Sequence, residues 1–128
     1  MLDGIIVINK PKGCTSHDVV SKVKKILGEK VGHTGTLDPN ATGVLPVLIG
    51  KATKLSEYLM EHDKTYIATI KLGEKTTTGD SEGEVIETKE VITLEKEIIE
   101  SALNSFLGKQ IQTPPMYSAI KVDGKKTV

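Results

Sequence analysis

The segment GHTGTLDPNATGVLP, residues 32–46, places one carboxylate, Asp38, among glycine, threonine and proline residues and directly before an apolar run. Glycine lets the backbone approach a ligand closely, Pro39 stiffens the mount of the carboxylate, and threonine hydroxyls can hydrogen-bond a carboxylate or a phosphate. This pattern fits a preorganised catalytic carboxylate on a rigid loop. An ordinary turn closed by the Asp38 side chain fits the same residues.

Two further side chains could contact a ligand of this loop. His33 lies five residues before Asp38 and could pair with a base edge or a phosphate, or serve only the structure. The GHTG around it weakly matches the GXXG loop of RNA-binding KH domains. Tyr66 is one of four aromatic residues. It is either a core residue with a hydrated hydroxyl or a platform on which a base stacks.

The sequence gives little support for a metal site or a nucleotide site. Residues 76–84 carry three carboxylates at alternate positions but lack the spacing of a calcium loop, so we expect an acidic turn. No set of cysteine and histidine residues has zinc spacing, and there is neither a P-loop nor a serine-hydrolase elbow. We therefore expect no metal and no cofactor.

The composition is that of a soluble globular domain, or part of one, with 128 residues, 38% hydrophobic and 27% charged. No apolar run approaches the about 20 residues of a membrane helix, and the N-terminus lacks a signal-peptide pattern. The lone Cys14 suits a reducing compartment. We expect a cytoplasmic protein with no membrane partner.

Charge is unevenly distributed along the chain. Residues 1–55 hold eight lysines and four acidic residues, a net charge of +4, and the remainder carries −4. A basic N-terminal half suits a phosphate-bearing partner, although a solvated lysine face gives the same count. The chain contains no arginine, so a bidentate guanidinium contact would have to come from elsewhere.

Hydrophobic periodicity predicts the elements that must position these residues. A cap at Thr15 or Ser16 and a stop at Gly28 bound the first helix, and Asp123-Gly124 predicts a hairpin turn. The predicted strands are residues 4–10, 44–49, 65–72, 84–91, 116–122 and 125–128; the predicted helices are residues 16–27, 51–62 and 93–107; residues 74–83 form a polar loop. This mixed order predicts an α+β fold with substantial antiparallel pairing.

Together these motifs resemble the pseudouridine synthases of the bacterial TruB type, which modify the T-loop uridine of transfer RNA. The order and spacing match from residue 4 to about residue 126. The resemblance implies the pseudouridine synthase fold, a mixed, largely antiparallel sheet flanked by helices. The motifs that carry it are NKPKG at residues 9–13 with Thr15-Ser16, GHTGTLDPNATG at 32–43 with the following VLP, KTY at 64–66, residues 76–83, and PPMYSA at 114–119 with Lys121.

The resemblance implies that Asp38 is the catalytic carboxylate. The family reaction breaks the uridine N1–C1′ bond, turns the detached base and joins C5 to C1′, without a cofactor. A carboxylate stabilises the positive charge at C1′ or traps it covalently, so attack by Asp38 and elimination through a glycal both remain open. The target base must be flipped out of its stack.

The same resemblance implies roles for five other residues. His33 lies beside the flipped nucleotide, and Tyr66 stacks on the target base. Lys10 and Pro11 shape the floor behind the catalytic loop, and Asp80 belongs to the hydrogen-bond network of the active site.

The resemblance also implies that residues 1–128 are the N-terminal portion of a catalytic domain, without its active-site arginine and without the C-terminal RNA-binding domain. We therefore expect a truncated chain that is inactive alone, and a monomer at full length whose partner is the T-stem loop of tRNA. The alternative is a non-catalytic RNA-binding or tRNA-folding module.

Overall fold

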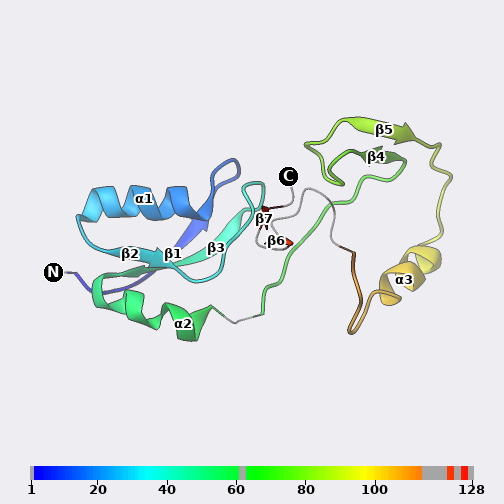
Figure 1. Cartoon of the computed structure of the whole chain (residues 1–128). Helices are drawn as coiled ribbons and strands as arrows, with labels where there is room; N and C mark the ends of the chain where they lie inside the picture. Colours follow the sequence, from blue (N-terminus) through cyan, green and yellow to red (C-terminus); the bar gives the residue numbers. More distant parts are fainter. Residues whose placement is uncertain (1, 61–62, 114–120, 123–124, 127–128) are drawn as a thin grey trace. The chain divides into compact units, whose positions relative to one another are not determined.

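The computed structural model describes residues 2–60, 63–113, 121–122 and 125–126. The chain divides into two compact units, Met1–Tyr66 and Ile67–Val128, called here the first and the second unit. The first unit contains the segment with Asp38, and Figure 1 shows its elements in blue to green.

The first unit is built on a three-stranded antiparallel sheet. Its strands are β1 (Gly4–Lys10), β2 (Val31–His33) and β3 (Gly43–Ile49), in the order β1-β3-β2. The central position of β3 explains its nearly continuous apolar sequence, because a central strand covered on both faces is buried on both. Strands at residues 4–10 and 44–49 are confirmed, whereas the short β2 was not predicted.

Helix α1 (Ser16–Leu27) covers one face of this sheet (Figure 1). It begins at a capping box in which the Thr15 hydroxyl accepts from the Asp18 N–H and the Asp18 carboxylate accepts from the Thr15 N–H. It ends at Gly28, whose φ of +68° is the left-handed conformation that favours glycine. Its apolar stripe builds the core cluster of Val19, Val23, Leu37, Leu45 and Val47. The predicted helix is confirmed.

The predicted helix at residues 51–62 is wrong in its form. The chain makes a 3₁₀ helix, η1 (Gly50–Leu55), followed by one short turn of α-helix, α2 (Ser56–Leu59). Neither has a side-chain cap, so nothing fixes a regular start. Leu55 and Leu59, two apolar residues of this segment, are 45% and 39% exposed. With so little apolar area buried, tertiary packing cannot hold a longer helix.

The described part of the second unit contains two short antiparallel strand pairs and one helix. Strands β4 (Glu74–Thr76) and β5 (Val85–Thr88) pair antiparallel, with an irregular register between Lys75 and Thr76. Thus β4 occupies part of the predicted loop, and β5 is shorter than predicted. Helix α3 (Lys96–Asn104) has Glu95 at its N-cap position without a side-chain capping hydrogen bond, and it is shorter than the predicted helix at residues 93–107.

Two predicted strands have different outcomes. Residues 65–72 form no strand, because no described segment pairs with them and a strand needs a neighbour to satisfy its backbone. The predicted C-terminal hairpin is confirmed in its pairing, since β6 (Lys121–Val122) runs antiparallel to β7 (Lys125–Lys126). The Asp123-Gly124 turn and residues 114–120 lie outside the described residues.

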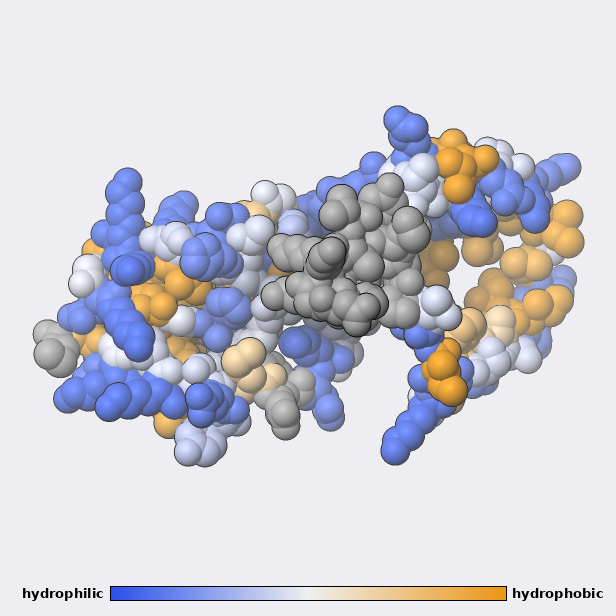
Figure 2. Space-filling model, in the orientation of Figure 1, coloured by the Kyte–Doolittle hydropathy of each residue, from blue (hydrophilic) through white to orange (hydrophobic). Residues whose placement is uncertain are grey.

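Apolar side chains lie on the surface of the second unit, where Figure 2 shows them in orange. None of its residues with a described side chain is buried. The large exposed ones include Ile67, Ile70, Ile86, Ile92, Ile98, Phe106, Leu107 and Ile111. No helix within the described ranges is long and apolar enough to cross a membrane. The helices and small antiparallel sheets confirm the α+β fold class.

The capping box of α1 can be tested by Thr15→Ala, which removes the hydroxyl that caps the helix. We expect the free energy of unfolding to fall by about 1 kcal/mol near neutral pH, as measured by urea unfolding. The exposed Ser21→Ala in the same helix is the control.

The loss should also depend on pH. The hydroxyl and N–H of Thr15 hold the pKa of Asp18 below its ordinary value of 3.8. A depressed folded-state pKa adds stability above the unfolded-state pKa, and this is lost as pH falls through the folded-state pKa. The difference in the free energy of unfolding between the parent and Thr15→Ala should therefore become smaller in acid. A difference that grew as the pH fell would contradict the capping box.

Candidate active site

Asp38 lies on the loop that connects β2 to β3, and its residue is exposed to solvent. Its carbonyl accepts a hydrogen bond from the Ala41 N–H at 3.0 Å, which closes a turn over residues 38–41. The turn predicted around Asp38 is therefore present, made by the backbone rather than by the carboxylate. The side chain stays available for a ligand.

The residue before Asp38 is held by a buried serine. Ser16, 1% exposed, accepts from the Leu37 N–H at 3.0 Å and donates to the Leu37 carbonyl at 3.2 Å. The Leu37 side chain belongs to the core cluster beneath α1. Leu37 is thus fixed through its backbone and its side chain, although it lies in neither a helix nor a strand.

The residue after Asp38 is held by a buried lysine. Lys10 is fully buried, and its Nζ donates to the carbonyls of Cys14 at 2.7 Å, Pro11 at 3.0 Å and Pro39 at 3.1 Å. A lysine ammonium has three donors, so these three carbonyls satisfy it completely. The Pro39 carbonyl also accepts from the Gly13 N–H at 2.9 Å. The structure therefore brings Lys10 and Pro11 to the turn that carries Asp38.

His33 is the last residue of β2, paired with Val47 of β3, just before the loop. The residue is partly buried, and its Nδ1 is a buried atom with no hydrogen-bond partner among the described residues. The next residue, Thr34, is buried and donates its N–H to the Pro46 carbonyl at 3.1 Å, which extends the ladder by one bond. The imidazole thus lies at the junction between the regular sheet and the loop.

The glycines of the loop serve its backbone conformation. Gly35 and Gly43 have φ values of +78° and +128°, a region that side chains rarely adopt. A Cβ added at Gly43 would meet no atom within 4 Å, so crowding does not explain this glycine. Thr36 and Thr42 of the same loop are exposed.

The other two predicted residues belong neither to the loop between β2 and β3 nor to the side chains that hold it. Tyr66 ends the first unit outside any strand and is 57% exposed, so the interpretation as a core residue is wrong. Asp80 belongs to the second unit. Its Oδ1 accepts from the Thr78 hydroxyl at 2.6 Å and from the Glu82 N–H at 2.9 Å, and these bonds lower the pKa of Asp80. The predicted acidic turn is confirmed.

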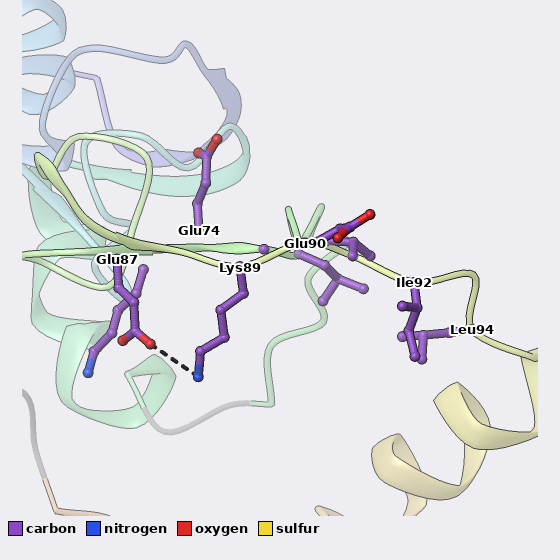
Figure 3. A pocket seen from close by; sticks show the side chains of 10 residues that line it. Glu74, Glu87, Lys89, Glu90, Ile92 and Leu94 are labelled. Atoms are coloured by element: carbon purple, nitrogen blue, oxygen red, sulfur yellow. Dashed lines mark ion pairs between the residues drawn. The ribbon is translucent and has the colours of Figure 1, made fainter.

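A pocket of about 430 Å³ lies in the second unit, between residues 72–75 and residues 87–94 (Figure 3). Its charged side chains are Glu74, Lys75, Glu87, Lys89 and Glu90, and an ion pair of 3.1 Å joins Lys89 to Glu87. None of the predicted site residues lines it. Over the described ranges, no three His, Cys, Asp or Glu residues are grouped to hold a metal ion.

Sequence reasoning did not find the buried contact of Ser16. Thr15 and Ser16 were interchangeable as caps, and only the observed cap at Thr15 leaves the Ser16 hydroxyl free to reach Leu37. Ser16 and Leu37 are 21 positions apart in the sequence, so no local pattern predicts the contact.

The role of Lys10 can be tested by Lys10→Met, which keeps the length of the side chain but removes its three donors. We expect the free energy of unfolding to fall by about 1–3 kcal/mol, because the partly buried carbonyls of Pro11, Cys14 and Pro39 each lose the charged donor of Lys10. Lys12→Met, an exposed lysine of the same segment, is the matched control. Equal urea midpoints for the two variants would contradict the role of the buried ammonium.

Comparisons with known proteins agree on one family. The family model for the TruB family pseudouridylate synthase (N terminal domain) matches residues 23–128. The chain is 56% identical over 128 residues to the tRNA pseudouridine synthase B of Bacillus subtilis, covering 98% of this chain and 41% of that protein. For the tRNA pseudouridine synthase B of Geobacillus thermodenitrificans the identity is 52%, covering 98% and 42%.

A solved structure, the crystal structure of a Cbf5-Nop10-Gar1 complex, is also similar. It is 35% identical with a TM-score of 0.59, covering 92% of this chain and 31% of that one. The chain spans about two fifths of the length of the curated relatives it matches. The exposed carboxylate of Asp38 thus lies within the segment that the family model covers, and the chain belongs to the TruB family of pseudouridylate synthases.

Proposed function

We propose that the full-length protein converts a uridine in the T-loop of tRNA to pseudouridine, with Asp38 as the catalytic carboxylate. One observation carries the proposal. The Asp38 carboxylate is exposed, while the residues on both sides of it are held by the buried side chains of Ser16 and Lys10. A fixed backbone beneath a free carboxylate is what electrostatic stabilisation of a developing charge requires. Membership of the family and the names of the relatives support the substrate class.

The proposed reaction is an isomerisation that needs one carboxylate. The N1–C1′ bond breaks, positive charge develops at C1′, and Asp38 stabilises it or bonds to it. The detached uracil turns, C5 bonds to C1′, the C5 hydrogen leaves as a proton and N1 gains one. No water enters the product, so the second carboxylate that glycosidases use to handle water has no task here.

Other parts of the site have proposed roles toward the RNA. His33, at the start of the loop, would contact the flipped nucleotide, and the exposed ring of Tyr66 would stack on the target base. Lys10 and Pro11 would support the loop from behind, and Asp80 would join the site through its ordered turn. We propose a cytoplasmic protein, in keeping with its single Cys14.

The proposed reaction can be measured as tritium release from a T-stem-loop RNA that carries 5-³H-uridine, because the new C5–C1′ bond expels the C5 hydrogen. We expect release by the full-length protein, and a loss on the order of 10³-fold or more in Asp38→Asn. Asp63→Asn removes an equal charge from an exposed aspartate and should keep the parent rate.

The outcomes separate the proposal from its rival. RNA binding without release by the parent would indicate a non-catalytic RNA-binding module. Release that survives in Asp38→Asn would remove Asp38 from the chemistry.

An RNA surface on the basic half should make binding sensitive to salt. Each phosphate contact releases counterions, so the logarithm of the affinity should fall with the logarithm of salt concentration by about 0.7–0.9 per contact. Filter binding of the T-stem loop between about 50 and 200 mM salt measures this slope. A slope of zero would mean that the lysines of residues 1–55 are only a solvated face.

A further inference from the structure

We infer that Ser16 is a positioning residue for the reaction, because its buried hydroxyl holds the backbone of Leu37 and thereby sets the place of the Asp38 carboxylate. The inference rests on the proposed function of Asp38. Ser16 itself touches neither RNA nor the reacting atoms, since it is 1% exposed.

The hydroxyl of Ser16 satisfies two backbone groups of one residue. Leu37 N–H donates to the Ser16 Oγ at 3.0 Å, and the Ser16 hydroxyl donates to the Leu37 carbonyl at 3.2 Å. Leu37 is itself buried, so its peptide groups need partners inside the protein. No strand or helix supplies these partners here, and the Ser16 hydroxyl serves as the partner of both the N–H and the carbonyl.

The helix does not need this hydroxyl. Thr15 caps α1 and exchanges hydrogen bonds with Asp18, so the N-terminal turn is closed one residue before Ser16. Serine is one of the residues preferred at the N-cap itself. Here the second hydroxyl is directed across to a segment 21 residues away. Its position in the helix fixes where Leu37 must lie.

The loop has its second attachment after Asp38. The Pro39 carbonyl accepts from the Lys10 Nζ at 3.1 Å and from the Gly13 N–H at 2.9 Å. Asp38 is therefore one residue away from a fixed point on either side. Without the Ser16 hydroxyl, the Leu37 side of Asp38 would be held only by the packing of the Leu37 side chain, and the carboxylate could shift relative to C1′.

The test compares Ser16→Ala with the parent, both as full-length protein, in single-turnover tritium release from the T-stem-loop RNA. A misplacement of the order of 1 Å can cost about 100-fold in rate, so we expect a fall of about 10- to 100-fold. The RNA dissociation constant and the fraction of protein that binds RNA should stay at the parent value. Ser21→Ala, an exposed serine of the same helix, should behave as the parent.

A general loss of stability is distinguished by Thr15→Ala, which weakens α1 at its cap without touching Leu37. If Thr15→Ala slows release as much as Ser16→Ala, or if the rate and the binding-competent fraction of Ser16→Ala fall together, the positioning role is overturned. Amide hydrogen exchange gives a readout independent of activity. Exchange at Leu37 should accelerate in Ser16→Ala and stay unchanged in Ser21→Ala.

Should Ser16→Ala not fold, Ser16→Cys serves the same comparison, because a thiol keeps the size but is a weak hydrogen-bonding group. A slowed rate with unchanged RNA affinity supports the inference, and a parental rate overturns it. An active parent that is inactivated by Asp38→Asn but unaffected at Ser16 refutes the positioning role alone. A parent without tritium release refutes the proposed function as well.

Discussion

The loop between β2 and β3 buries Leu37 without the help of regular secondary structure, and its peptide groups must be satisfied by side chains. Two buried polar residues do this. Ser16 pairs with both peptide groups of Leu37, and Lys10 gives its three donors to carbonyls that include that of Pro39. Ser16 belongs to α1 and Lys10 to β1, so the loop is attached to two regular elements that hold it in place. Asp38 is exposed and can therefore be preorganised, because the buried Leu37 before it and the Pro39 carbonyl after it are both held by buried side chains.

This constraint also orders the rest of the first unit. Lys10 is the last residue of β1 and pairs with Gly43, the first residue of β3, at the point where the loop with Asp38 joins the sheet. Ser16 reaches Leu37 because the capping box starts α1 at that residue and the apolar stripe of α1 packs on the sheet. A buried lysine with fully satisfied donors is tolerated, whereas its removal takes a charged donor from three carbonyls, of which that of Pro39 keeps the Gly13 N–H. Polar groups in this core thus give the loop a defined position.

Sequence reasoning succeeded where local signals act alone. The apolar run of β1, and the cap at Thr15 and stop at Gly28 of α1, lie within a few residues of the elements they define. It failed at residues 65–72, where alternation indicated a strand but no described segment pairs with it. It also failed over residues 51–60, where η1 and α2 lack a side-chain cap and contain no buried residue, while residues 61–62 of the predicted helix lie outside the described residues.

In the candidate site too, a feature with a local signal was predicted from the sequence and contacts without one were not. Asp38 stands out in the sequence by its type and its loop, and the resemblance assigned its role. The contacts that hold it span 21 residues for Ser16 and 29 for Lys10, and depend on how α1 and β1 pack. Such contacts follow from tertiary structure and leave no local pattern.

The most direct measurement is a crystal structure of the full-length protein with a T-stem-loop RNA, in which the distance from the Asp38 carboxylate to C1′ of the flipped uridine is read. We expect one carboxylate oxygen within about 3.5 Å of C1′, with Ser16 still hydrogen-bonded to Leu37. A different carboxylate at C1′, with Asp38 turned to solvent, would contradict it.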